Sequence, residues 1–432
     1  MKQEKLATVT HPEWGKHPVQ EFDVARYISP EHVARERECL WPNTWQVACR
    51  EEEIPNPGDY HEYEIADQSL LVTRTPSGQI KAYFNACLHR GTQLAKGCGH
   101  VREFMCPFHN WRWSLDGDSR FVLDKADFPG MKAADLKLPE AQVGQWGGFV
   151  FVKLTEGGPA FDDYIKPVAD GLAPYELDQY RIRFWKTTIM KCNWKTALEA
   201  FEEVYHTLGT HPQIMKGMDD VGTDYELLGE HSRMIVTNMI PSARYKGNVK
   251  EREVMEVSIE GLLDFGLADD EEATYLASLA KEGKTTRDMF LDMTYGANTQ
   301  YMPKLDKERF LQVHHYTIFP NICFNQMAGA FVGLLSRPNG NDPDSCIFDV
   351  ICLQHPAGKE IPTAKRETVT DPNYNWGVVM AQDQGNLELM QKGFHQMTLK
   401  KTRLAGYQER RLANRHNVID TYYERFGKEA AR

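Results

Sequence analysis

The sequence predicts an α+β protein in which a small all-β domain is inserted into a larger domain of mixed sheet and helices. Between residues 45 and 155, short alternating apolar segments follow one another closely, as in a compact all-β unit. Residues 156–432 mix strand-like runs with longer helical segments, and residues 1–44, an arm and a helix, are expected to join that larger domain. A chain of 432 residues with 41% hydrophobic and 26% charged residues is long enough for such a multidomain architecture.

The first part of the chain predicts an arm, a helix and a set of short strands. Residues 1–30 are polar and rich in Pro, which indicates an arm over the surface or over a neighbouring subunit, and residues 31–40 have helical propensity. After them, β-branched and aromatic residues alternate with polar ones between turn residues. Strands are therefore expected at 45–49, 60–65, 70–73, 80–85 and 146–152.

The larger domain is predicted from the segments that follow residue 156. An alternating strand at 181–191 precedes a helix at 193–207, and residues 250–290 and 379–428 are mostly helical in pattern. Their mixture with strands favours a mixed sheet flanked by helices. The further strands are expected at 225–229, 233–240, 311–319, 322–324, 331–336 and 346–353.

Charge and composition exclude several classes of partner. The net charge of −11, without a run of Lys or Arg, argues against nucleic acid or an anionic membrane as partner. The sequence has neither a signal-peptide core nor an apolar run long enough to span a bilayer, so a cytoplasmic location is expected. Nine scattered cysteines, an odd number, indicate reduced thiols rather than a disulfide framework.

Two short motifs combine cysteine with histidine in a metal-ligand spacing. Cys87-Leu88-His89 is a C-x-H arm, and Cys106-Pro107-Phe108-His109 is a C-x-x-H arm. Such arms can hold a tetrahedral zinc ion, or a [2Fe–2S] cluster with thiolates on one iron and imidazoles on the other. Zinc fingers usually pair like ligands within an arm, so one Cys and one His in each arm favours the cluster.

The residues after each arm suit the turns that a cluster needs. Gly91 permits a tight turn in which backbone N–H groups point at the sulfurs. Asn110 holds the equivalent place after the second arm, and it is one of the few residues other than Gly that tolerates a left-handed conformation.

A second polar group lies on the helix predicted at 193–207. On a helical wheel its members fall within about 100° of one another, which is one face. An amphipathic helix normally exposes such a polar face to water, and that interpretation suits the three carboxylates. The members are Glu199, Glu202, Glu203 and His206.

The two histidines at the end of this helix suggest a metal site instead. His211 lies about 140° from His206 on a regular helix, so the helix must unwind between them if both imidazoles are to reach one ion. Gly209 and Pro212 are placed to allow that unwinding. By pattern alone, the metal site and a solvated polar face remain open.

A carboxylate from far along the chain could complete an iron site. A mononuclear iron that reacts with dioxygen uses a facial triad of two histidines and one carboxylate, which leaves positions open. Asp383, in Gln382-Asp383-Gln384-Gly385, is the candidate for the third ligand. The alternative is an N-cap or first-turn acid of the helix that follows.

Together these motifs resemble the terminal oxygenase component, the α subunit, of Rieske non-haem iron oxygenases of the aromatic-ring-hydroxylating type. The resemblance covers nearly the whole chain in motif order and spacing. It implies a Rieske domain at 45–155 and a helix-grip catalytic domain, with an antiparallel sheet around a long helix, at 156–432. It also implies that Cys87, His89, Cys106 and His109 hold a [2Fe–2S] cluster, and that His206, His211 and Asp383 hold Fe(II).

The resemblance assigns a further role to Glu203. In this family, a carboxylate three residues before the first iron-binding histidine links that histidine to a cluster histidine of the neighbouring subunit, here His206 and His109. Ring-hydroxylating dioxygenases usually carry Asp there, whereas Glu fits relatives that resemble choline and carnitine monooxygenases. Phe108 and Asn110 also depart from the Tyr and Gly that are frequent in the family.

The implied reaction uses O2, a small apolar substrate and electrons that come ultimately from NAD(P)H. No G-x-G-x-x-G motif is present in the sequence, so a separate reductase or ferredoxin is expected to supply the electrons. Electron transfer between subunits implies a ring-like oligomer, a homotrimer, with or without β subunits. A non-catalytic electron-transfer protein or a zinc-binding protein is the alternative from other classes.

The expected substrate is an aromatic or alicyclic compound that is hydroxylated or cis-dihydroxylated. The alternative is a monooxygenase or N-demethylase for a quaternary ammonium compound, which would need an aromatic cage and a counter-charge, for example Glu199 or Glu202. Apolar residues between 200 and 330 are the candidates for the pocket wall, and about a third of them are expected to face substrate. They are Phe201, Ile214, Met215, Met218, Met239, Met289, Phe290, Met293, Tyr295 and Phe324.

Overall fold

The chain divides into two compact units, as the computed structural model shows for residues 6–264, 274, 278, 284–295 and 299–427. One unit contains the segment that ends at Val33 together with Pro167–Thr421. The other contains Ala34–Lys166 and the segment that begins at Tyr422. The second unit is thus inserted into the first, and the segment 45–155 lies entirely within it. The predicted α+β class with an inserted β domain is confirmed.

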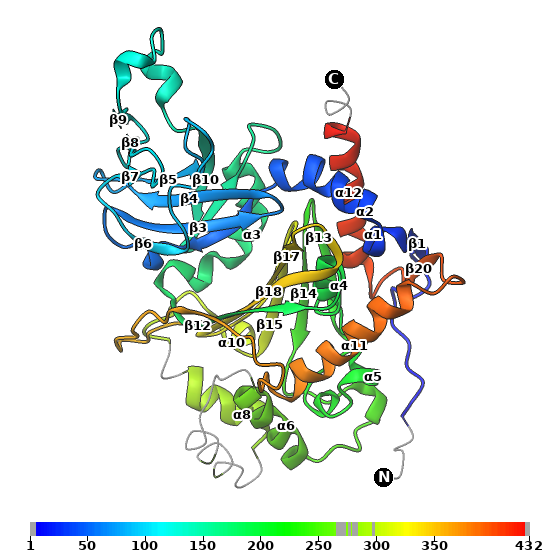
Figure 1. The fold of residues 1–432 in the computed structure, drawn as a ribbon. Coiled ribbons are helices and arrows are strands. Elements are labelled where there is room, and N and C mark those ends of the chain that lie inside the picture. The colour runs from blue at the N-terminus through cyan, green and yellow to red at the C-terminus, as the bar shows by residue number, and fades with distance from the viewer. Residues whose placement is uncertain (1–5, 265–273, 275–277, 279–283, 296–298, 428–432) are drawn as a thin grey trace. The chain divides into compact units, whose positions relative to one another are not determined.

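Within its described residues, the inserted unit is built on an antiparallel sheet of seven strands (Figure 1). Their spatial order is β2 (Gln46–Arg50), β11 (Phe149–Lys153), β10 (Glu140–Trp146), β5 (Ile80–Phe84), β4 (Gln68–Arg74), β3 (Asp59–Ile65) and β6 (Cys98–His100). A separate group of three short strands, β7 (Phe104–Met105), β8 (Arg112–Trp113) and β9 (Ser119–Phe121), carries the second Cys/His arm.

The strand predicted at 146–152 is wrong at its start. β10 ends at Trp146 and β11 begins at Phe149, and the two strands pair with each other antiparallel. Gly147 and Gly148 have φ angles of 58° and 76°, which is the left-handed conformation that a two-residue hairpin turn requires. A pair of glycines within an apolar run therefore marks a reversal of the chain.

In the larger unit, the described residues form a sheet of eight strands that are antiparallel except for the parallel pair β12–β19. The predicted strands are present in this sheet, and β19 is an additional short strand. The spatial order is β13 (Asp224–Leu228), β14 (His231–Thr237), β15 (Gln312–Ile318), β16 (Ile322–Met327), β17 (Ala330–Asn339), β18 (Asp342–Gln354), β12 (Arg181–Met190) and β19 (Arg366–Thr368).

Helices of the larger unit pack on this sheet and on one another. α4 (Trp194–Glu199) packs against β17 and β18, and α11 (Val378–Phe394) packs against α4 and the short α5 (Thr207–Thr210) (Figure 1). This antiparallel sheet with helices against it agrees with the expected helix-grip arrangement. The other described α-helices are α1 (Ala25–Ile28), α2 (Pro30–Arg35), α3 (Phe161–Leu172), α6 (Glu251–Asp264), α8 (Thr286–Phe290), α10 (Lys307–Phe310) and α12 (Arg410–Phe426).

The N-terminal arm contributes a strand to the larger unit. β1 (Gln20–Asp23) pairs antiparallel with β20 (Lys401–Leu404), so this part of the arm is built into the fold rather than draped over it. The helix predicted at 31–40 is formed by α2 and a following π-helical turn, Glu36–Leu40. The helical prediction at 250–290 is met by α6 and α8, and most of residues 265–283 lie outside the described residues. None of the described helices is long and apolar enough to cross a membrane.

Candidate metal centres and substrate pocket

The two Cys/His arms have the same backbone geometry. In the first arm the N–H of Gly91 donates to the carbonyl of Cys87 over 2.8 Å, and Gly91 has a φ of 81°. In the second arm the N–H of Asn110 donates to the carbonyl of Cys106 over 3.0 Å, and Asn110 has a φ of 60°. Both arms are therefore tight turns that end in a left-handed residue, as the sequence predicts for Gly91 and Asn110.

Both thiols are buried and receive hydrogen bonds from the turn that follows each of them. The backbone N–H groups two and three residues after each cysteine are directed at its sulfur. Burial raises the pKa of Cys87 despite these bonds, while at Cys106 the bonds outweigh burial and lower the pKa. The N–H groups favour the thiolate form, which is the form that binds metal.

The two imidazoles of the arms face each other through the same ring atom. Nδ1 of His89 lies 3.1 Å from Nδ1 of His109, and the ring of His89 stacks on the buried Trp111 at a centroid distance of 5.0 Å. Two buried thiols and two converging Nδ1 atoms are the donor set that a [2Fe–2S] cluster with mixed ligation requires. The residues present therefore fit this cluster.

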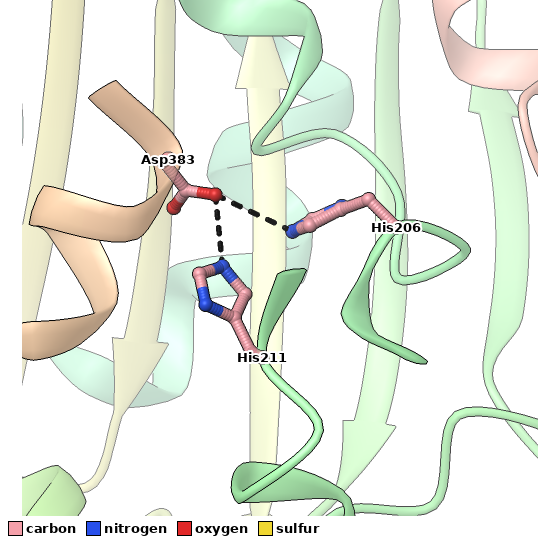
Figure 2. A group of neighbouring side chains, drawn as sticks. All are labelled: His206, His211 and Asp383. Carbon is pink, nitrogen blue, oxygen red and sulfur yellow. Dashed lines mark hydrogen bonds and ion pairs between the residues drawn. The ribbon is translucent and has the colours of Figure 1, made fainter. Parts of the chain in front are cut away.

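Three side chains from two distant segments converge in the larger unit. Nε2 of His211 lies 2.8 Å and Nε2 of His206 lies 3.8 Å from Oδ1 of Asp383 (Figure 2). One ligand atom from each of the three lies within 4.8 Å of the others, and the two rings are nearly perpendicular. Asp383 is the sixth residue of α11, which begins at Val378 and has Gly377 as its N-cap. The N-cap alternative for Asp383 is therefore wrong.

The other ring nitrogen of each histidine is already engaged. Nδ1 of His206 lies 2.7 Å from Oε1 of Glu203, and Nδ1 of His211 lies 2.8 Å from Oε1 of Gln382. Because these oxygens accept, each Nδ1 carries a proton, and Nε2 is the ring atom that each histidine directs at Asp383. Two imidazole Nε2 atoms and a carboxylate oxygen that converge in this way are the donor set of a facial-triad metal site, so the residues fit a divalent metal ion.

The electrostatic surroundings also favour positive charge at this place. Burial lowers the pKa of His206, but the carboxylates of Glu203 and Asp383 outweigh burial and raise it. The same two carboxylates would stabilise a metal ion held by His206 and His211, because they lie in a buried region where charges interact strongly.

The local fold differs from the helix predicted at 193–207. α4 ends at Glu199, the chain is irregular before His206, and α5 forms the turn between His206 and His211. The helix therefore ends before the first histidine and does not unwind between the two. Oε2 of Glu203 accepts the backbone N–H of His206 over 2.9 Å in place of a helical hydrogen bond, so α4 is not continued through this segment.

The polar face of that predicted helix is not exposed to water. Glu199 accepts a hydrogen bond from Tyr27 over 2.8 Å and lies 3.0 Å from Nε2 of His416. Glu202 is fully buried and is bound by Thr317 and Arg415. The solvated interpretation of these carboxylates is wrong, and neither Glu199 nor Glu202 lines the pocket where it could act as a counter-charge.

A cavity of about 280 Å³ opens beside His206, His211 and Asp383. Half of the ten predicted wall residues line it, namely Phe201, Ile214, Met218, Met239 and Phe290. Met215, Met289, Tyr295 and Phe324 do not line it, and the side chain of Met293 lies outside the described residues.

The sheet provides a wall of the cavity that was not predicted from the sequence. Side chains on one face of β14 to β17 line the cavity at alternate positions, except that Gln312 lines it next to Val313 at the start of β15. The two-residue periodicity of those segments was a usable signal, but the choice of face requires knowledge of what packs on the sheet. The residues include Met234, Val236, Val313, His315, Asn325 and Val332.

Protein-family models match both the larger unit, which contains the candidate iron site, and the segment that contains the two Cys/His arms. The family model for the ring hydroxylating alpha subunit (catalytic domain) matches residues 173–425, and the model for the Rieske [2Fe-2S] domain matches residues 44–128. The first match covers more than half of the chain. The Rieske match favours the [2Fe–2S] cluster over the zinc alternative at the two arms.

Individual relatives include both monooxygenases and a dioxygenase. The glycine betaine monooxygenase oxygenase subunit of Chromohalobacter salexigens is 34% identical over 194 residues, and the match spans 44% of this chain and 43% of the relative. A quaternary ammonium Rieske monooxygenase solved with L-carnitine has a TM-score of 0.67 and 16% identity over 93% of this chain and 95% of its own. Naphthalene 1,2-dioxygenase from Rhodococcus sp. has a TM-score of 0.61 and 17% identity over 94% of both chains. At these identities the structural similarities show the fold.

Proposed function

Because the chain belongs to the family of ring-hydroxylating α subunits and carries a Rieske [2Fe–2S] domain, we propose that it is a terminal oxygenase. The observation that carries the proposal is the convergence of two histidines and a carboxylate beside a mainly apolar cavity. When bound there, Fe(II) would supply O2 activation with electrons received from the cluster.

We assign the ligands of the two centres on the geometry of their donor atoms. Cys87, His89, Cys106 and His109 would hold the cluster, within a Rieske domain that we place at 45–155. The mononuclear iron would be held by His206, His211 and Asp383, which leaves positions open for O2 and substrate.

Glu203 and Gln382 orient the two histidine ligands. Each accepts the Nδ1 proton of its imidazole, which fixes the tautomer and directs Nε2 at the metal. Glu203 carries a charge, so it also increases the basicity of His206 as a ligand, whereas the neutral amide of Gln382 has a weaker effect on His211.

The pocket supports an uncharged, mainly apolar substrate. None of the described residues that line it is Lys or Arg, and its two carboxylates, Glu203 and Asp383, are engaged with the histidines. A charged substrate would be buried there without a free counter-charge, which is costly. The proposed reaction is hydroxylation or cis-dihydroxylation of an aromatic or alicyclic compound.

A quaternary ammonium substrate is the second candidate because of the relatives. The glycine betaine enzyme of Chromohalobacter salexigens matches this chain, although the match spans less than half of that relative's length. Three phenylalanines, Phe201, Phe290 and Phe310, line the pocket and could contact a cation through their ring faces.

We propose a homotrimer in which Glu203 links His206 to His109 of a neighbouring subunit, with electrons delivered from NAD(P)H by a separate ferredoxin or reductase. β subunits are compatible with this arrangement.

Metal analysis of anaerobically purified protein tests the proposal first. We expect about three irons and two sulfides per chain, and a reduced EPR spectrum with the low average g-value of mixed His/Cys ligation. Zinc in place of iron, or a cluster without the third iron after iron is restored, would contradict an oxygenase.

Oxygen uptake then separates the two candidate substrates. With a reductase and NADH supplied, naphthalene should stimulate oxygen uptake that is matched by hydroxylated product, while glycine betaine should not. The reverse result would establish the second candidate. Replacement of His206 by Ala should abolish uptake with either compound and leave the cluster spectrum unchanged.

A further inference from the structure

One row of side chains across the sheet interrupts the apolar wall of the pocket. Residues opposite one another in β14, β15, β16 and β17 point to the same face, and this row consists of Met234, His315, Asn325 and Val332. All four line the pocket. His315 and Asn325 are direct cross-strand neighbours, so two polar side chains lie together between apolar residues on both sides.

A buried arginine fixes the tautomer of His315. Nη2 of Arg411 lies 3.0 Å from Nδ1 of His315, and an arginine can only donate. Nδ1 is therefore the acceptor, and the proton of the neutral ring is on Nε2. Burial, with the positive charge of Arg411, holds the pKa of His315 well below its usual value, so the ring is neutral.

Arg411 is itself held in place by other buried groups. Its Nε donates to Ser232 over 3.0 Å, its Nη1 donates to the carbonyl of Glu202 over 2.9 Å, and its Nη2 also donates to Thr317 over 2.8 Å. Ser232 and Thr317 form the neighbouring row of the same sheet face. Counted from Thr317 back along β15, His315 is the next residue of that face, and it lines the pocket whereas Thr317 does not.

The remaining polar atoms of the pair have no protein partner. Within the described part of the chain, no group accepts a hydrogen bond from Nε2 of His315, and the side-chain amide of Asn325 makes no hydrogen bond. Both residues line the cavity, so these groups are available to a bound molecule. An N–H donor beside an amide suits an oxygen acceptor on the ligand.

We propose that His315 and Asn325 form the hydrogen-bonding end of the pocket, and that the substrate is an uncharged ring compound with one carbonyl-type oxygen held by Nε2–H of His315. This inference rests on the proposed oxygenase function and names its substrate class. A ketone fits better than a carboxylate, because none of the described lining residues is Lys or Arg. Holding the oxygen at this end would fix which carbon of the ring faces the iron site, so His315 determines regioselectivity.

Binding of a matched pair of compounds tests this substrate class. The probes are 1-indanone and indane, which differ in one carbonyl group, and their dissociation constants are measured by anaerobic headspace gas chromatography with the full-length holoenzyme. The measured quantity is the ratio of the two constants, which removes the general affinity for an apolar ring. In H315F the preference for the ketone should fall about fivefold to tenfold, as expected for one lost hydrogen bond.

Three further variants make the result interpretable. N325L removes a side chain that has no protein partner, so it should fold normally and reduce the preference by a smaller factor. H315N should retain part of the preference, since its amide can accept from Arg411 and donate to the ketone. M234L, the apolar neighbour of His315 in the same row, should leave the ratio unchanged.

The outcomes separate this inference from the proposed function. An unchanged ratio in both H315F and N325L, or the absence of binding of either probe by the native protein, would overturn the inference. Iron and sulfide are measured on the same samples, and full contents would then leave the oxygenase proposal intact. If the preference for the ketone falls in H315F as expected, but the protein cannot be loaded with the third iron, the oxygenase proposal would be contradicted. The assignment of His315 and Asn325 as a hydrogen-bonding subsite would still hold.

Discussion

The two candidate metal centres are built in different ways. The cluster arms lie within residues 87–110, and backbone turns of the same geometry position their ligands. The mononuclear site joins His211 to Asp383, which is 172 residues away, and side-chain hydrogen bonds orient its imidazoles. A site made of local turns depends on the conformation of a few residues, whereas a site made of distant segments depends on the packing of the helices that carry them. The two sites should therefore respond differently to substitution.

Loss of a thiol at the local site should have the largest effect. C106S should remove the cluster, because the ligand is a thiolate and a serine hydroxyl does not replace it, and iron should fall from about three to about one per chain. Visible absorption and metal analysis measure this change. C98S is the matched control, since Cys98 lies between the arms in sequence but is exposed on β6, and it should retain the cluster.

Loss of the distant carboxylate should remove one metal and leave the other centre intact. D383A should reduce iron from about three to about two per chain and abolish oxygen uptake, while the cluster spectrum stays unchanged. E388Q, on the same helix but outside the pocket, is the control and should keep all the iron. If D383A lost the cluster as well, the two sites would not be independent.

Removal of an orienting group should weaken metal binding without abolishing it. Q382A removes the acceptor for Nδ1 of His211, so we expect the affinity for Fe(II) to fall about 10-fold to 100-fold. Titration of the apo-protein with Fe(II) measures the change, with Q384A as control. No change in affinity would show that packing alone orients His211.

The smallest effect is expected from a change of backbone preference in the first arm. G91A places a Cβ in open space at a φ of 81°, so its cost of about 1–2 kcal/mol comes from the left-handed conformation alone. G130A has the same features at a φ of 86° outside the arms and should destabilise the fold similarly. Only G91A should also speed cluster loss on warming, which absorption would follow.

The predictions that differ most from the structure concern carboxylates whose hydrogen bonds to other parts of the chain decide their burial and the local backbone. The helical wheel placed Glu199, Glu202 and Glu203 on one exposed face, but each is buried and bound to a different group. The wheel predicts which side chains share a face of a regular helix, and it cannot predict that the helix ends at Glu199 or that Glu203 accepts the backbone N–H of His206. The pocket candidates were half right for a similar reason, since apolar residues that line a cavity and those that fill the core have the same composition.

The sequence by itself determined the local chemistry of this protein. Ligand types, their spacing, and the left-handed residues at Gly91 and Asn110 are properties of contiguous segments, so the cluster arms and the pair of histidines could be read directly. Only the tertiary structure decided that Asp383 faces those histidines and that His315 and Asn325 share one row of the pocket wall. Helix packing and strand register bring these residues together, and both depend on contacts between segments that are far apart in the chain.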